Sequence, residues 1–195
     1  MEREKIKVPA AILEYAGAQI GGVIAPTDFL GIGQRDAIDQ ALSRLARDGR
    51  LLRLARGIYA LPVVTKFGVH GPRTDEMLKG LRRITGDRYV LTGAAEANQI
   101  GFTTQVPTRA KYWTTGRAMT LSIGELKIEI EKSPQDIAKI DGEWGKVIRA
   151  VSAIGKDAQV IAKARKMLHG IPLSNGVSSL RGELGEIARL LNVAA

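Results

Sequence analysis

The spacing of apolar residues changes partway through residues 34–62, and this change predicts a helix followed by a β-hairpin. The apolar face of the helix is formed by residues three and four positions apart, which are Ile38, Ala41, Leu42 and Leu45. Gly33 and Gln34 open this pattern. Gly49 ends it, because a residue without a β-carbon adopts a left-handed conformation at low cost. Short apolar segments then flank Gly57, which favours a tight turn between two strands.

Two further helices are predicted upstream of this pair. The apolar stripe of the first contains Val8, Ala11, Ile12 and Tyr15. The second is short and begins at residues 25–28, with Thr27 or Asp28 as its capping residue. The resulting order of three helices and a hairpin resembles a winged helix-turn-helix, in which the third helix is the recognition helix and the hairpin is the wing.

The apolar and polar pattern of the remaining residues predicts a mixed α/β domain with terminal helices. The fold class expected for the whole chain is α+β. Residues 63–74 contain Gly68, Gly71 and Pro72, and we expect a linker there. The predicted domains are therefore a winged helix-turn-helix at 1–62 and a mixed α/β domain at 75–195. Strands are expected at 88–91, 111–115, 118–123 and 126–131. Helices are expected at 75–85, 94–100, 144–154, 158–168 and 178–191, with a further helix start at Ser133-Pro134.

Arginines recur at every third position across the third helix and the hairpin. They are Arg44, Arg47, Arg50, Arg53 and Arg56. A major groove admits an α-helix, and a hairpin arginine beside it can reach a phosphate or the adjacent minor groove. The alternative interpretation is a solvated helix surface without a ligand, because exposed charged residues are common. Clustering on one helix and its hairpin favours DNA contact.

Composition agrees with a polyanionic partner. The net charge is +9 and the isoelectric point is about 10.0, so phosphate neutralisation with release of counterions is favoured. The positive excess is spread along the chain, and the arginine series therefore locates the predicted DNA reader better than the total charge does. The chain has no cysteine, no apolar run of membrane-spanning length and no clear signal peptide, so we expect a cytoplasmic protein.

Catalytic and cofactor motifs are not found in the sequence, and we expect a protein that is not an enzyme. His70 and His169 lie far apart and lack carboxylate or cysteine neighbours at metal-ligand spacing, so no metal is expected. Gly31-Ile32-Gly33 lacks the third glycine and the preceding strand of a dinucleotide-binding motif. Glu129 and Glu131 alternate on a predicted strand, where a solvated face explains them more simply than acid–base chemistry. No cofactor is predicted.

Two segments together resemble a known family. ALSRLARDGRLLRLARGIYALP at residues 41–62 and LTGAAEANQIGFTTQVPTRAKYWTTGRAMTLSIGELKIEI at residues 91–130 resemble the AbiEi-type antitoxins of type IV, abortive-infection toxin-antitoxin systems. The more diagnostic part is AAEANQIG at residues 94–101 with TQVP at residues 104–107 and the strand that bears Tyr112. The resemblance covers most of the chain and is weakest after about Lys132.

The resemblance implies a repressor that binds inverted repeats in its own promoter and counteracts a nucleotidyltransferase-like toxin without a stable complex. The recognition-helix contacts implied by it are Arg35, Gln40, Arg44 and Arg47, and the wing contacts are Arg53 and Arg56. With the neighbouring Thr27, Gln34 and Ser43, these residues are the predicted DNA-binding site. A protein-interaction module that uses the same fold as a scaffold is the alternative hypothesis, because a fold does not fix a function.

Overall fold

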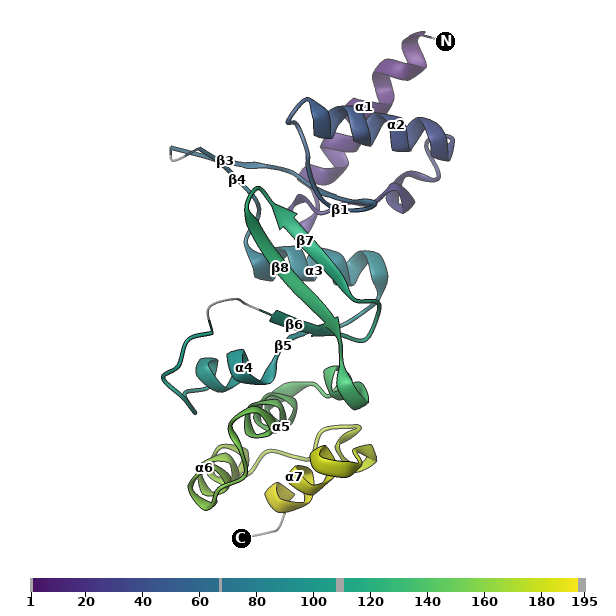
Figure 1. The fold of residues 1–195 in the computed structure, drawn as a ribbon. Helices are drawn as coiled ribbons and strands as arrows, with labels where there is room; N and C mark the ends of the chain where they lie inside the picture. Colours follow the sequence, from purple (N-terminus) through teal and green to yellow (C-terminus); the bar gives the residue numbers. More distant parts are fainter. Residues whose placement is uncertain (1, 67, 108–110, 193–195) are drawn as a thin grey trace. The chain divides into compact units, whose positions relative to one another are not determined.

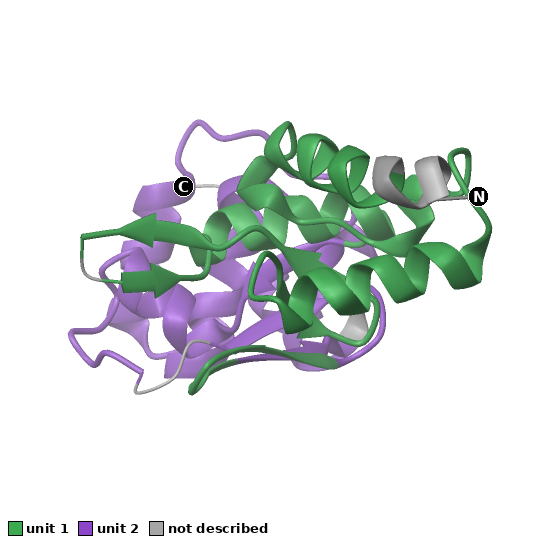
Figure 2. Ribbon diagram, turned by 90° about the horizontal axis from the view of Figure 1, so that it is seen from above, with its two compact units in different colours: residues 1–87, 119–127 green, residues 88–118, 128–195 purple. Residues whose placement is uncertain are grey.

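The computed structural model describes residues 2–66, 68–107 and 111–192, and the fold is mixed α+β, as predicted (Figure 1). The chain forms two compact units, coloured separately in Figure 2. Unit 1 contains Met1–Asp87 and Met119–Lys127, and unit 2 contains Arg88–Ala118 and Ile128–Ala195. In the described part of the chain, no helix is both long enough and apolar enough to cross a bilayer.

Unit 1 begins with helices and continues into two hairpins. Its elements, with η for a 3-10 helix, are α1 (Glu2–Gly17), η1 (Ile20–Gly22), η2 (Pro26–Phe29), α2 (Arg35–Arg47), β1 (Leu52–Ala55), β2 (Ile58–Ala60), β3 (Val63–Thr65), β4 (Gly68–His70), α3 (Thr74–Thr85) and β7 (Met119–Ile123). The apolar faces of α1 and α2 share one core, to which η2 adds Phe29, β2 adds Tyr59 and the residue before β1 adds Leu51. Burial of these apolar faces is the main stabilising contribution to this part of the unit.

The predicted helix and hairpin at 34–62 are confirmed by the structure. α2 begins after Gln34, and all four predicted apolar residues of its stripe are buried. Gly49 follows α2 with a φ of 70°, and Gly57 lies in the turn between β1 and β2 with a φ of 72°. Tyr59 exchanges two backbone hydrogen bonds of 2.9 Å with Ile24, which holds the hairpin on the segment before η2.

The short helix predicted at residues 25–28 is a 3-10 helix with Ala25 as its N-cap residue, so neither Thr27 nor Asp28 occupies that position. Asp28 still contributes to capping, because its carboxylate, at the third helical position, accepts the amide of Ala25 at 2.9 Å in a capping box. Asp28 also accepts hydrogen bonds from both terminal nitrogens of Arg83 on α3, at 2.7 and 3.0 Å. Burial acts to raise the pKa of Asp28, but the hydrogen bonds from Arg83 and Ala25 outweigh it and lower that pKa below its usual value.

The predicted linker and domain boundary differ from the observed units. Residues 63–74 contain β3 and β4 and the start of α3, and all of them belong to unit 1. α3 also belongs to unit 1, where it packs closely on η1: a β-carbon at Gly80 would lie 2.6 Å from Cβ of Val23. Two short strands around glycines have too few residues to show an alternating pattern, so their sequence resembles that of a loop.

Unit 2 combines a small sheet with a helical core. Its elements are β5 (Tyr89–Leu91), α4 (Gly93–Gln99), β6 (Lys111–Thr114), most of β8 (Leu126–Lys132), η3 (Pro134–Lys139), α5 (Gly142–Ile154), α6 (Ala158–Leu168), η4 (Val177–Ser179) and α7 (Gly182–Asn192). β6 pairs antiparallel with β5 and parallel with β8. The helix start predicted at Ser133 is a 3-10 helix, in which the Ser133 hydroxyl accepts the amide of Ala138.

A buried ion pair joins α4 to α5. Nε and Nη2 of Arg149 donate to one carboxylate oxygen of Glu96 at 3.0 and 2.8 Å, and both residues are at most 4% exposed. Nη1 of Arg149 donates to the carbonyl of Ile140 at 3.4 Å. Gly93 approaches the backbone of Arg149 so closely that a β-carbon would collide with its carbonyl oxygen. Glu96 of the AAEANQIG segment is therefore part of the interior of unit 2.

Candidate nucleic-acid interface

The outward face of α2 carries most of the residues predicted to contact DNA. Its buried stripe faces the core of unit 1, so the remaining positions of the helix face solvent. The exposed predicted residues on α2 and at its N-cap are Gln34, Arg35, Gln40, Ser43, Arg44 and Arg47. The thirteen-residue helix is about 20 Å long, and these side chains are distributed along its exposed face. An α-helix of this kind fits into the major groove of a duplex.

Part of this face is hollowed. Asp39, Gln40, Ser43, Arg44 and Arg47 line a shallow concavity of about 420 Å³. Four of these five residues carry hydrogen-bond donors, and two of them are guanidinium groups that can bind a guanine edge or a phosphate with two hydrogen bonds. The structure therefore brings Gln40, Ser43, Arg44 and Arg47 together between the middle and the C-terminal end of α2.

The β1–β2 hairpin presents the other two predicted arginines. Arg53 is exposed on β1, whereas the next residue, Leu54, is buried, as expected for alternating strand residues. Arg56 is exposed in the turn beside Gly57. Thr27 is exposed on η2, and Gln34 and Arg35 lie at the N-terminal end of α2, so these three predicted residues lie outside the concavity.

The arginine series is available for a ligand. Arg44, Arg47, Arg50, Arg53 and Arg56 are all exposed, and none of them has an ion pair or side-chain hydrogen bond to any described residue. Arg35 differs, because its Nε donates to Asp39 at 3.0 Å across one turn of α2. An ion pair within α2 restricts the orientation of Arg35 and reduces its free charge.

Arg50 belongs to the arginine series but not to the predicted contacts, and it is exposed on the same unit. It lies in the turn after α2 and, with Arg44, lines a second concavity of about 320 Å³. The other residues of this concavity come from α1, α2 and the start of the turn, and they are Val8, Pro9, Ala37, Gln40, Ala41, Leu45 and Asp48. Arg50 can be found from the sequence, because it occupies one position of the arginine series that recurs at every third residue.

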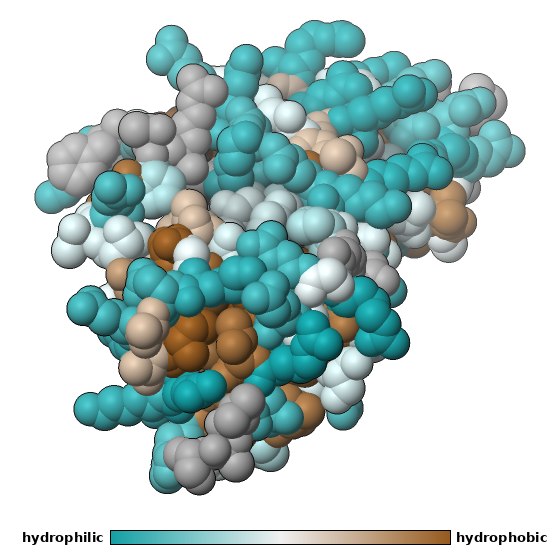
Figure 3. Space-filling model, turned by 60° about the horizontal axis from the view of Figure 1, so that its bottom comes forward, coloured by the Kyte–Doolittle hydropathy of each residue, from teal (hydrophilic) through white to brown (hydrophobic). Residues whose placement is uncertain are grey.

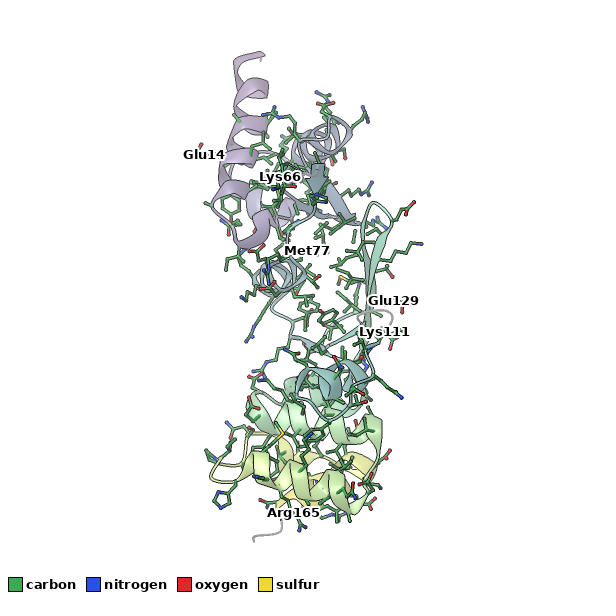
Figure 4. The ribbon with its side chains drawn as sticks, turned by 90° about the vertical axis from the view of Figure 1, so that its left-hand side faces the viewer. Glu14, Lys66, Met77, Lys111, Glu129 and Arg165 are labelled. Atoms are coloured by element: carbon green, nitrogen blue, oxygen red, sulfur yellow. The ribbon has the colours of Figure 1, made fainter. Side chains whose placement is uncertain are left out.

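Some charged residues elsewhere are engaged in internal contacts. On unit 2, Lys111 bridges Glu129 at 2.9 Å and Glu131 at 3.1 Å, and Figure 4 labels the first two of these residues. The hydrogen bonds that the ammonium group of Lys111 donates to these carboxylates raise its pKa. An ion-pair network thus accounts for the two glutamates of β8. Across residues 2–66, 68–107 and 111–192, no three His, Cys, Asp or Glu side chains form a metal-binding group.

Unit 2 has a surface of different character. Figure 3 turns the lower end of Figure 1 toward the viewer and shows apolar side chains gathered among hydrophilic ones. A groove of about 490 Å³ lies on this unit near η4 and α7. It is lined by Leu173, Val177, Ser178, Leu180, Arg181, Gly182, Gly185, Ala188, Arg189 and Asn192. An apolar floor with two arginines suits a protein segment better than an extended polyanion.

Comparison with known proteins gives one family. The model of DUF6088, described as a family of unknown function, matches residues 13–172. This range includes α2, both hairpins and most of unit 2. No curated protein matches the chain.

Proposed function

This chain belongs to the DUF6088 family, whose function is unknown, and we propose that it is a DNA-binding transcriptional regulator of its own operon. In this proposal α1, η2, α2 and the β1–β2 hairpin act as a winged helix-turn-helix. α2 is the recognition helix, and β1–β2 is the wing. The single observation that carries the proposal is the series of five exposed arginines without internal partners, on one helix and the hairpin that follows it.

The proposed contacts follow from the position of each side chain. α2 lies in the major groove, where Gln40, Ser43, Arg44 and Arg47 reach base edges or the flanking phosphates. Arg53 and Arg56 bind the backbone or the adjacent minor groove from the hairpin. The exposed residues at the N-terminal end of this surface, Thr27, Gln34 and Arg35, contact phosphates that fix the register of the helix.

Salt dependence of binding tests the DNA-binding proposal. Five arginine–phosphate contacts give a slope of about −4.5 for log K against log salt, which is a loss of roughly 500-fold in affinity between 50 and 200 mM salt. The measurement is a fluorescence-anisotropy titration of the full chain with a labelled duplex from directly upstream of its gene. An undetectable shift, or binding that is insensitive to salt, would overturn the proposal.

We further propose that the protein is the antitoxin of a type IV pair and counteracts a nucleotidyltransferase-like toxin. Support comes from the resemblance of residues 41–62 and 91–130 to AbiEi-type antitoxins. The expected result is growth rescue when the protein is expressed from a separate promoter while the neighbouring gene is induced. The Arg44→Ala/Arg47→Ala variant should rescue equally well, because its substitutions lie on the DNA-reading face. Absence of an adjacent nucleotidyltransferase-like gene, or of rescue, contradicts this part alone.

A second candidate function is protein interaction, and the groove on unit 2 favours it. Its occupant in that case is a partner segment with apolar and acidic side chains, which complement the apolar floor and Arg181 and Arg189. The two functions are distinguished by the titration above: a regulator loses affinity with salt at its upstream duplex, whereas an interaction module shows no such complex.

A further inference from the structure

The second hairpin of unit 1 is a small two-stranded ribbon. β3 and β4 pair antiparallel, with Val63 opposite His70, Val64 opposite Val69 and Thr65 opposite Gly68. All six residues are exposed, and no other strand of the described chain pairs with either edge. Figures 1 and 2 both show the ribbon extending away from the rest of the unit. It therefore contributes little to the core of the unit.

The apolar character of the ribbon is concentrated in one cross-strand pair. Val64 is 76% exposed and Val69 is 61% exposed. Residues directly opposite each other in an antiparallel pair project from the same face, with their β-carbons about 5 Å apart. The ribbon therefore exposes a small apolar patch to solvent, which is the kind of surface that a partner covers.

The charge around the ribbon indicates which partner fits. Between Asp48 and Asp75 the chain contains no carboxylate side chain. The same stretch contains five cationic residues, one on β1 and the others in the segments between elements, namely Arg50, Arg53, Arg56, Lys66 and Arg73. Lys66 is exposed in the turn between β3 and β4 and is labelled in Figure 4. A ribbon that is apolar at one point and lies in a chain segment with cationic but no acidic side chains is complementary to a nucleic-acid groove.

We infer that the β3–β4 ribbon is a further DNA-contacting element, an inference that rests on the proposed DNA-binding function. The ribbon lies in the major groove beyond the stretch occupied by α2, a groove that accommodates two-stranded ribbons. Val64 and Val69 pack on thymine methyl groups, and the ammonium group of Lys66 binds a phosphate. β3 follows the hairpin wing after only Leu61 and Pro62, so both hairpins belong to one continuous DNA-facing segment.

The length of the ribbon sets the expected size of the contact. Each strand has three residues, which at about 3.4 Å per residue gives a ribbon roughly 10 Å long. The rise of a duplex is about 3.4 Å per base pair, so the ribbon covers about three base pairs. The region of the upstream duplex protected from cleavage should therefore extend about three base pairs beyond one side of the segment that α2 contacts.

The test uses full-length protein, the labelled upstream duplex and hydroxyl-radical footprinting. Val64→Thr/Val69→Thr keeps the β-branched shape but replaces one methyl group of each valine by a hydroxyl group, which weakens the apolar contact. We expect about tenfold weaker binding, a footprint shorter by about three base pairs and an unchanged salt slope. Lys66→Ala should reduce the salt slope by about 1. Val106→Thr is the matched control, because Val106 is also 76% exposed but lies in unit 2, and its affinity should equal that of the wild type.

Three results overturn the inference. Unchanged affinity and footprint in Val64→Thr/Val69→Thr, with binding still lost in Arg44→Ala/Arg47→Ala, refute the ribbon contact and leave the proposed function standing. Conversion of a wild-type dimer to a monomer in sedimentation, with the protected length per site unchanged, assigns the valines to self-association. A wild-type protein that binds no upstream duplex overturns the ribbon contact together with the proposed function.

Discussion

Replacing Arg149 by methionine is expected to lower the free energy of unfolding of unit 2 by about 3–5 kcal/mol. The substitution keeps a long side chain but leaves the carboxylate of Glu96 buried without its charged partner. It also removes the donor to the carbonyl of Ile140. Glu96→Met should cost a similar amount for the converse reason, because the guanidinium group of Arg149 then remains buried without a counter-charge.

Urea unfolding followed by tryptophan fluorescence measures this effect. Both tryptophans of the chain, Trp113 and Trp144, lie in unit 2, so their emission reports on that unit. The double variant Glu96→Met/Arg149→Met should recover much of the lost stability, because a pair of apolar side chains replaces the whole ion pair. Lys156→Met is the control, since it breaks an exposed pair with Glu186 and should change the transition little. Equal transitions for wild type and Arg149→Met would contradict the structural role of the pair.

The largest functional effect is expected from Arg44→Ala/Arg47→Ala, which should weaken binding to the upstream duplex about 100-fold. Each arginine contact to a base edge contributes roughly 1–3 kcal/mol, and two of them at the lower half of that range give this factor. The salt slope should also become shallower by about 2, because two cationic groups whose binding releases counterions from the duplex are lost. Anisotropy titrations at several salt concentrations measure both quantities.

Two further variants separate base reading from general charge. Lys79→Ala/Arg82→Ala removes two positive charges from α3 in the same unit and should leave specific affinity nearly unchanged. Arg44→Lys/Arg47→Lys keeps the charge but loses the two-pronged geometry of guanidinium, so the salt slope should persist while discrimination against an unrelated duplex falls. If the α3 variant loses as much affinity as the α2 variant, binding depends on total charge and α2 is not the reader.

The sequence predicts α2 and its hairpin well because their signals are local. Ile38 and Leu42 are one helical turn apart, so the apolar stripe can be recognised within a short stretch of sequence. Gly49 and Gly57 mark the end of the helix and the turn of the hairpin. The exposed positions of α2 follow directly from that stripe. For this reason the predicted residues from Gln40 to Arg47 lie together in the structure, whereas Thr27 lies apart on η2.

The remaining features depend on contacts between distant residues. Glu96 and Arg149 are 53 positions apart, and nothing in either neighbourhood indicates a partner for the other. Asp28 resembles a local cap in the sequence, but Arg83 engages it from a helix 55 positions later. Pairing of this kind cannot be read from periodicity, because periodicity describes one element at a time.

The return of the chain to unit 1 at β7 has a practical consequence for dissecting the protein. Leu121 of β7 is fully buried, and Ile123 lies against Gly71 at the base of the β3–β4 ribbon. A fragment that stops at residue 62 or 87 therefore lacks a strand that the N-terminal unit contains. Domain swaps and truncations should retain residues 119–127, for example by grafting β7 through a short glycine-rich connection after residue 87.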